Sequence, residues 1–403
     1  MSPPVDANLS SQALLPSFFI GGFECSTHRR RQDGKRLDMV SATAHDRHAF
    51  EDYQRLRGHG ILTARDGVRW HLIERTPGVY DFSSALPVVR AARDAGVVVI
   101  WDLCHYGWPD WLDIFAPEFV PRFARFAREF VKVLTAESDG ALFISPVNEI
   151  SFFAWAGGEV GYFNPFALGR GNELKAQLVR ATVEGVEAVW AVNPRARVVH
   201  TDPVINVVSD SAKPEEIPLA ESYRLSQYQV WDMLAGRLSP ELGGHPKYLD
   251  ILGLNYYPHN QWIFGQPSFN PACALPRTHP LYKPFRLLIR ETFGRYRRPL
   301  LVAETGAEGE ARAGWLNYVC GEVRAAMRAG VQVEGVCLYP VVNHPGWEDE
   351  RHCHNGLWDY ADEAGGREIY LPLSHEISRQ MRLVEQERAG RGRSHAGSPE
   401  VML

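Results

Sequence analysis

The stretch Leu142-Phe-Ile-Ser-Pro-Val-Asn148-Glu149 is an apolar run that ends in an amide followed by a carboxylic acid. Its composition predicts a strand with both faces buried, as in a parallel sheet. Parallel α/β folds place their reactive side chains at the carboxyl ends of such strands. Asn148 and Glu149 are therefore the first candidate site residues.

A second stretch, Pro299-Leu-Leu-Val-Ala-Glu304-Thr-Gly306, has the same organisation: an apolar strand, a carboxylate at its end and a glycine turn. Two carboxylates at strand ends are the pair that a retaining glycosidase needs, one as acid/base and one as nucleophile. Either motif alone is weak, because buried strand-end glutamates also serve as structural hydrogen-bond partners. Together they predict Glu149 and Glu304 as a catalytic pair.

The rest of the chain alternates between strands and helices. Apolar runs predict eight strands, at 17–24, 61–70, 97–105, 142–149, 196–202, 248–256, 299–304 and 333–339. Helical patterns predict eight helices, at 44–57, 82–95, 119–135, 172–192, 219–234, a segment ending at 295, 311–329 and 374–387. This count predicts an α/β fold with a single (β/α)8 TIM barrel and extended βα loops. A doubly wound sheet is the alternative, but it usually has a glycine-rich phosphate turn that this sequence lacks.

Composition and charge exclude several classes of protein. A net charge of −5 with mixed signs gives no general attraction to nucleic acid or to membranes, and no apolar run is long enough to span a bilayer. The first residues lack the basic and apolar regions of a signal peptide. Six scattered cysteines fit reduced thiols, so we expect a cytoplasmic protein. We predict a loose segment at 1–17, a barrel at 18–388 and a disordered tail at 389–403.

The motifs at the strand ends resemble those of clan A glycoside hydrolases, and most closely glycoside hydrolase family 1, the β-glucosidase family. The similarity runs from about Phe18 to Trp347. The matching segments are Asn148-Glu149 (Asn-Glu of strand four), Ala303-Glu304-Thr-Gly (Thr-Glu-Asn-Gly), Gly253-Leu-Asn-Tyr-Tyr257 (Gly-Leu-Asn-Tyr-Tyr of strand six), His105-Tyr106 with Pro109 (His-Trp-Asp-Leu-Pro) and Arg69 (an arginine on strand two).

The resemblance implies a role for each of these residues. Glu149 is expected to be the acid/base and Glu304 the nucleophile. Arg69 is the cation expected to keep Glu304 ionised, and the Tyr256 hydroxyl is expected to orient it. The residues expected to bind the sugar are Asn148 (hydrogen-bonded to its 2-hydroxyl), His105, Trp347 (stacked on the ring) and Tyr339 (at the place of the family's strand-eight tryptophan).

Two positions depart from the family pattern. His28-Arg29 occupies the place of the strand-one glutamine, and Gly346 replaces the glutamate before the final tryptophan. Arg29 also opens a basic run that ends at Arg36. Because guanidinium pairs well with carboxylate or phosphate, we predict an acidic or otherwise modified sugar, bound through Arg29, and poor turnover of plain β-glucosides. For the basic run itself a solvated loop is the default interpretation, and a grip on an anionic sugar or a phosphate is the alternative.

The segment Arg351-His352-Cys353-His354 is a candidate metal site, but neighbouring residues rarely all point at one ion, so we expect a solvated loop. We predict no metal and no cofactor, with a small carbohydrate as the binding partner. The favoured function is a retaining β-glycosidase that hydrolyses a β-O-glycosidic bond. The alternatives are a transglycosylase with the same residues, a carbohydrate-binding barrel without turnover and a metal-dependent barrel hydrolase. The sugar, the linkage, the aglycone and the oligomeric state stay open.

Overall fold

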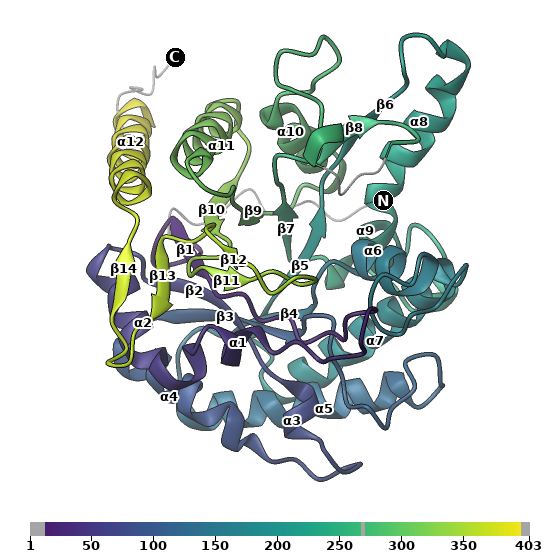
Figure 1. Ribbon diagram of the computed structural model, residues 1–403, viewed down its shortest axis with the longest axis vertical. Helices are drawn as coiled ribbons and strands as arrows, with labels where there is room; N and C mark the ends of the chain where they lie inside the picture. The colour runs from purple at the N-terminus through teal and green to yellow at the C-terminus, as the bar shows by residue number, and fades with distance from the viewer. Residues whose placement is uncertain (1–12, 267–270, 396–403) are drawn as a thin grey trace, which may run out of the picture.

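Eight parallel strands close into a barrel in the computed structural model, which describes residues 13–266 and 271–395 (Figure 1). Their order around the barrel is β1, β10, β9, β7, β5, β4, β3, β2. They span Phe19–Gly22 (β1), Thr63–Gly67 (β2), Val98–Cys104 (β3), Phe143–Val147 (β4), Arg197–Pro203 (β5), Ile251–Asn255 (β7), Leu300–Thr305 (β9) and Val333–Leu338 (β10). The predicted TIM barrel is confirmed, and each predicted strand overlaps one of these eight.

Helices form a layer around the strands (Figure 1). They are α2 (His45–Gly58), α4 (Leu86–Ala95), α5 (Phe119–Glu137), α7 (Gly171–Val192), α8 (Ile217–Leu225), α9 (Gln229–Leu234), α10 (Phe285–Tyr296), α11 (Ala311–Arg328) and α12 (Leu371–His395). The single helix predicted at 219–234 is in fact two, α8 and α9, with a 3-10 turn between them at Ser226–Tyr228. Among the described residues, no helix combines the length and the apolar character that a bilayer crossing needs.

The connections contain further short elements. The short helices are α1 (Met39–Ala42), α3 (Trp70–Ile73), α6 (Ile150–Phe153) and a π-helical turn at Ala154–Glu159. Three two-stranded sheets pair β6 (Asn206–Val208) with β8 (Gln261–Ile263), β11 (His344–Pro345) with β12 (His352–Cys353), and β13 (Trp358–Ala361) with β14 (Arg367–Ile369). These elements belong to the extended loops that the sequence predicts.

Side chains of the barrel strands alternate between two cores. One core fills the barrel interior, with Ile20, Ile100, Phe143, Val199, Ile251, Leu301 and Cys337 from seven of the strands. Their chain neighbours, such as Trp101, Ile144 and Leu252, instead pack in the layer between strands and helices. The alternation follows from the pleat of a β-strand. It decides which polar side chains near the strand ends reach the inside of the barrel.

Both ends of the described chain differ from the prediction. Leu15 is 4% exposed and belongs to the interior core, because an apolar side chain there is removed from water, so residues 13–17 are not simply loose. Helix α12 continues to His395, past the predicted boundary at 388, since extending an existing helix costs little compared with starting one. Residues 1–12 and 396–403, which make up the rest of the two predicted segments, lie outside the described residues.

Candidate active site

The barrel opens into a cavity of about 1080 Å³ that Glu149 and Glu304 both line. Glu149 follows β4 with Asn148 between them, and Glu304 lies on β9. The barrel order places β5 and β7 between these two strands. The structure therefore brings the predicted pair into one cavity, where His105, Tyr339 and Trp347 also line the wall.

Glu149 is buried and held by two hydrogen-bond donors. Tyr106 Oη donates to its Oε2 at 2.5 Å and Asn255 Nδ2 donates to its Oε1 at 2.9 Å. Its backbone has a positive φ of 47°, a strained conformation for a residue with a side chain. Burial, followed by the negative charge of Glu304, raises the pKa of Glu149 to about 8. The raised pKa favours the protonated form of the Glu149 carboxyl group.

Glu304 receives a hydrogen bond on each of its carboxylate oxygens. Arg65 Nη1 donates to Oε1 at 2.8 Å and Tyr257 Oη donates to Oε2 at 2.8 Å. A cation and a hydroxyl donor are the contacts that stabilise negative charge on a carboxylate. The two glutamates therefore have different surroundings, with a guanidinium beside Glu304 and neutral donors around Glu149.

Glu304 reaches the barrel interior because of a β-bulge. Leu301 faces the interior, so a regular strand would turn the side chain three positions later toward the helices. The pairing of β9 with β7 passes from Val302 to Glu304 in one step, which leaves Ala303 as an extra residue. Such bulges rotate the side chains that follow them, and they are common beside active sites.

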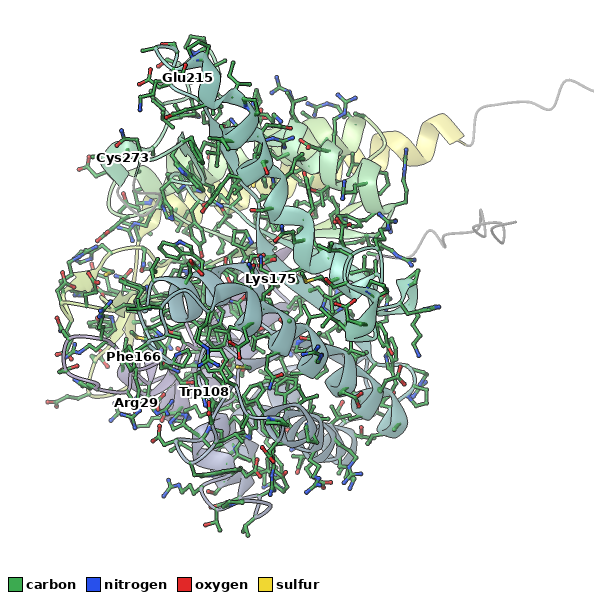
Figure 2. All side chains as sticks on the ribbon, turned by 90° about the vertical axis from the view of Figure 1, so that its right-hand side faces the viewer. Arg29, Trp108, Phe166, Lys175, Glu215 and Cys273 are labelled. Atoms are coloured by element: carbon green, nitrogen blue, oxygen red, sulfur yellow. The ribbon has the colours of Figure 1, made fainter. Side chains whose placement is uncertain are left out.

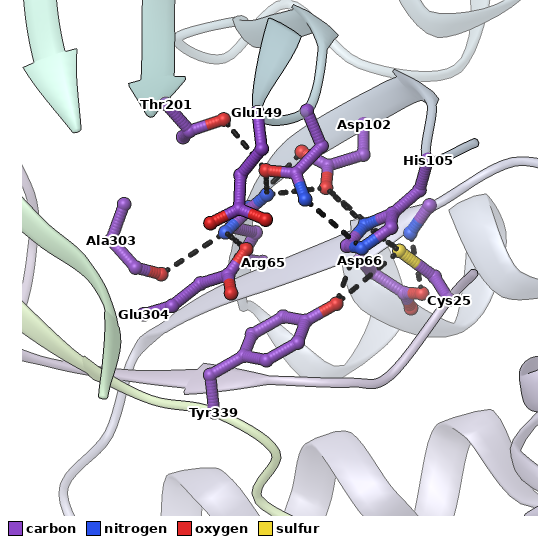
Figure 3. Close-up of polar contacts among 12 residues, drawn as sticks. Cys25, Arg65, Asp66, Asp102, His105, Glu149, Thr201, Ala303, Glu304 and Tyr339 are labelled. Atoms are coloured by element: carbon purple, nitrogen blue, oxygen red, sulfur yellow. Dashed lines mark hydrogen bonds and ion pairs between the residues drawn. The ribbon is translucent and has the colours of Figure 1, made fainter. Parts of the chain in front are cut away.

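Arg65, not Arg69, is the cation beside Glu304 (Figure 3). A guanidinium group has five N–H donors, and Arg65 uses all five. They go to Asp102 Oδ1 (3.1 Å) and Oδ2 (2.7 Å), Glu304 Oε1 (2.8 Å), the carbonyl oxygen of Ala303 (3.1 Å) and Asn148 Oδ1 (2.7 Å).

The prediction for Arg69 is wrong because this residue lies past the end of β2, at the start of α3. Its guanidinium pairs with Asp46 at 2.9 Å and Asp38 at 3.2 Å. Arg65 has an outward-facing neighbour, Ala64, and itself points into the barrel. The arginine inside the strand reaches the site, whereas the one beyond its end does not.

Tyr257, not Tyr256, supplies the hydroxyl that contacts Glu304. Ile251 on β7 faces the interior, so Asn255 and Tyr257 follow it inward while Tyr256 faces outward. The Tyr256 ring stacks on Phe285 of α10 at 3.9 Å between ring centroids. The predicted contact with Glu304 therefore belongs to Tyr257, the residue after Tyr256 in the chain.

Asn148 does not line the cavity. Its Nδ2 donates to His105 Nε2 and to Tyr106 Oη, both at 3.0 Å. Its Oδ1 accepts from Arg65 Nη2 at 2.7 Å and from Thr201 Oγ1 at 2.8 Å. Because both amide hydrogens are already used, the predicted contact with a sugar hydroxyl is not supported. Asn148 instead connects the surroundings of Glu149 with those of Glu304.

His105, Tyr339 and Trp347 lie at the cavity as the sequence predicts. His105 Nδ1 lies 3.1 Å from Asp102 Oδ2, which orients the ring. The Tyr339 ring packs against the Arg65 guanidinium at 5.1 Å. Trp347 packs with its ring 4.4 Å from that of His28, between the ring centroids.

Arg29 lies outside the cavity wall and is neutralised by Asp110. Its Nε and Nη2 donate to the two carboxylate oxygens of Asp110 at 2.9 and 2.6 Å. Arg36 pairs with the same carboxylate, and Arg30 and Lys35 pair with Glu350. Figure 2 shows Arg29 near the edge of the molecule. The structure therefore does not support the predicted contact between Arg29 and an acidic sugar, because nearby acidic side chains satisfy these cations.

Glu24, just after β1, is a site residue that the sequence analysis missed. Its side chain lines the cavity although the residue is only 6% exposed. Among the described residues, the Ser26 backbone N–H is its hydrogen-bond donor, at 3.0 Å. Tyr106, Tyr257 and Arg65 were missed as well. A charged residue inside an apolar strand, such as Arg65, is a signal that it needs a buried partner.

Two groups of side chains have the composition of a metal site within the described residues. Cys25, Asp102 and His105 form the buried group, but Arg65 already neutralises Asp102 through two hydrogen bonds. The second group joins His352 and His354 of the suspected loop to Asp359 of β13. His352 Nε2 lies 2.6 Å from Asp359 Oδ1. Asp359 comes from the hairpin of β13 and β14, so neighbours along the chain do not by themselves indicate this group.

Comparisons with known proteins agree with the architecture. No protein-family model matches the sequence, and no curated protein sequence matches it. Solved structures similar to this chain include the AHE enzyme from Alicyclobacillus herbarius, at 18% identity and a TM-score of 0.71 over 85% of this chain and 88% of that one. A family 1 β-glucosidase from Thermotoga maritima shares 15% identity and a TM-score of 0.69, over 91% and 97%.

A rice β-glucosidase mutant, solved in a covalent complex with Glc, shares 13% identity with this chain. Its TM-score is 0.72, over 90% of this chain and 97% of that one. Similarity at such low identity establishes the fold and leaves the chemistry to the residues of this chain. The family resemblance read from the strand-end motifs is therefore confirmed as a resemblance of fold.

Proposed function

We propose that this protein is a retaining β-glycosidase that works by double displacement, with Glu304 as nucleophile and Glu149 as acid/base. The observation that carries the proposal is the contrast between the two glutamates. Glu304 has the guanidinium of Arg65 on one oxygen, whereas burial and the charge of Glu304 raise the pKa of Glu149. Two carboxyl groups in one cavity, one held by a guanidinium and one with a raised pKa, are the groups that this reaction requires.

In the first step the Glu304 carboxylate attacks the anomeric carbon of the substrate. The bond from that carbon to the leaving oxygen breaks, and Glu149 gives its proton to this oxygen. The sugar is then held as an ester of Glu304. The hydrogen bonds from Arg65 and Tyr257 orient the nucleophile, and those from Tyr106 and Asn255 orient the proton donor.

In the second step Glu149, now a carboxylate, takes a proton from water. The water oxygen attacks the anomeric carbon, and the ester bond to Glu304 breaks. Glu149 is again protonated at the end of the cycle, and the sugar leaves with its original anomeric configuration. We expect the two carboxyl groups to lie about 5–5.5 Å apart in a crystal structure, the spacing typical of retaining enzymes.

The charge around the cavity favours neutral sugars over acidic ones. Glu24 adds a carboxylate to the wall beside Glu149 and Glu304, and Arg65 already uses all of its donors on Asp102, Glu304, the Ala303 carbonyl and Asn148. A carboxylate accepts hydrogen bonds from sugar hydroxyls and repels a negatively charged sugar. This expectation replaces the acidic sugar predicted from Arg29.

A screen of nitrophenyl β-glycosides tests the proposed function, with neutral sugars, uronides and phosphorylated sugars compared side by side. We expect turnover of at least one neutral β-glycoside, and NMR of the first product should show retention of configuration. Uronides should be slower than the neutral sugar of the same ring configuration. Added alcohol acceptors distinguish hydrolysis from transglycosylation. Binding of sugars without turnover of any glycoside would support the binding-barrel alternative instead.

The dependence of activity on pH should reveal the proton on Glu149. Because the acid form is required and its pKa is raised to about 8, kcat/KM should fall about tenfold per pH unit above that value. The Glu149→Gln variant cannot ionise, so its residual activity on an activated aryl glycoside should lack this alkaline decline. An unchanged alkaline decline in that variant would assign the titration to another group.

The two neighbouring tyrosines offer a matched test of the nucleophile's surroundings. Tyr257→Phe removes a hydrogen bond to Glu304, so kcat/KM should fall about 10- to 100-fold, in line with the roughly 1.5–3 kcal/mol of a hydrogen bond to a charged group. Tyr256→Phe is the control, because this hydroxyl contacts Tyr282 and Gln261 outside the barrel. Steady-state kinetics on one nitrophenyl glycoside provides the comparison. Equal losses in the two variants would contradict the assignment.

A further inference from the structure

Within the described part of the chain, a lysine on the far side of the cavity from Glu24 forms no ion pair with a carboxylate. Lys175 lies in the first turns of α7 and lines the cavity together with Asn172. Its Nζ donates one hydrogen bond, to Gln229 Oε1 at 2.8 Å. No carboxylate among the described residues forms an ion pair with this ammonium group, unlike the cations of the basic loop around Arg29. Two of its three N–H donors thus remain for a bound molecule.

The acidic group whose charge acts on Lys175 offers only weak compensation. Asp202, at the end of β5, is the carboxyl group whose charge Lys175 feels. It accepts hydrogen bonds from the backbone N–H and the hydroxyl of Ser151 at 3.0 and 2.6 Å. Burial raises the pKa of Asp202 to about 7, so it is not fully ionised at neutral pH. Burial also lowers the pKa of Lys175, which shows that its ammonium group is partly removed from water.

Lys175 lies on the same side of the cavity as Glu149, the proposed proton donor. The charge of Asp202 acts on Lys175 and also on Glu149, so the three groups share one region. Glu24 follows β1, and β1 and β5 lie four places apart either way around the eight-stranded barrel, which makes them opposite. The leaving group must sit beside the residue that protonates its oxygen. If the proposed function holds, the part of the cavity at Lys175 therefore receives the leaving group.

Aromatic side chains line this same cavity. Phe152 and Trp155 come from the chain immediately after Glu149, and Trp262 comes from β8. Flat, apolar walls of this kind pack well against a ring. We propose that Lys175 binds a carboxylate on an aromatic leaving group, so that the natural substrate is a β-glycoside of a carboxylated aromatic alcohol or phenol.

Binding of free leaving groups tests this proposal without requiring any turnover. The probes are 4-hydroxybenzoate and its neutral analogue 4-hydroxybenzamide, measured by titration calorimetry against the full chain. We expect the benzoate to bind at least about tenfold more tightly, and this preference to weaken with added salt. Lys175→Met should remove the preference and Lys175→Arg should retain most of it. Lys132→Met, a change at an exposed lysine on α5, is the matched control.

Equal affinity for the two phenols, including no detectable binding of either, overturns the role of Lys175. A similar loss of affinity for both phenols in Lys175→Met would also overturn this role. Such a loss would come from the packing of the lysine side chain and not from its charge. The ratio of kcat/KM for the 4-carboxyphenyl and 4-carbamoylphenyl glycosides of an accepted sugar extends the test to catalysis. Failure of the proposed function would instead appear as no turnover of any glycoside, with the calorimetric preference intact.

Discussion

Glu304→Ala is expected to abolish turnover of every glycoside, with kcat lowered by on the order of 10⁴–10⁶. The reason is that this variant has no group to form the glycosyl ester, and water has no route to the anomeric carbon from the same side. Measurement of kcat on a nitrophenyl glycoside and on an unactivated alkyl glycoside gives the size of the loss. Circular dichroism and thermal unfolding of the variant provide the control that the barrel is still folded.

Glu149→Ala is the matched control for this loss, because it removes the other carboxyl group of the same cavity. A nitrophenyl leaving group departs without a proton, so the first step should survive on this substrate and fall about 10²- to 10⁴-fold on the alkyl glycoside. Azide should restore turnover by replacing the water that Glu149 would activate, with a β-glycosyl azide as product. Equal losses for both variants on the nitrophenyl glycoside, or azide rescue of Glu304→Ala in place of Glu149→Ala, would reverse the roles.

Arg65→Met is expected to affect stability and activity together. It leaves Asp102 and Glu304 buried without their cation, and removing one partner of a buried pair costs about 3–5 kcal/mol. Three further hydrogen bonds, to Asn148, the Ala303 carbonyl and Asp102 through a second nitrogen, are also lost. We therefore expect a clear fall in the free energy of unfolding and a decrease in kcat/KM of at least about 10²-fold, since the nucleophile loses its positioning.

Urea denaturation and steady-state kinetics measure the two effects, with Arg69→Met as the control. Arg69 pairs with Asp38 and Asp46, which are only partly buried, so its replacement should cost less stability and leave kcat/KM within about threefold of the unchanged protein. A larger loss of activity in Arg69→Met than in Arg65→Met would contradict the site described here. That result would favour Arg69 as the cation that acts on Glu304, as the sequence alone predicts.

The sequence predicted the architecture and the meeting of Glu149 and Glu304 in one cavity because both follow from local patterns. Each barrel strand is a short apolar run, each is followed by a helical segment, and the complete count of eight indicates a closed barrel. Glu149 and Glu304 stand at the ends of two such runs. Since the carboxyl ends of all strands in a parallel barrel lie on one face, two strand-end residues far apart in the chain are expected to meet there.

The tertiary structure alone decided which side chains surround that pair. Strand parity turned Tyr257 inward and Tyr256 outward, and a bulge at Ala303 turned Glu304 toward the interior. Both effects depend on a shift of a single residue, which a pattern of hydrophobicity does not resolve. Arg65 lies 239 residues from Glu304 in the chain, and only closure of the barrel brings the two together.

The sequence also does not show which charged side chains pair with one another. The sequence shows a basic run beside the first strand, but the carboxylates that neutralise Arg29 and Lys35 come from Asp110 and Glu350, in distant loops. Nothing in the sequence of its helix marks Lys175, and only the folded chain leaves it facing the cavity without an ion pair to any carboxylate among the described residues. Periodicity is a local property that fixes the barrel, whereas the pairing of charges depends on which loops meet in space, and that is decided by the tertiary structure.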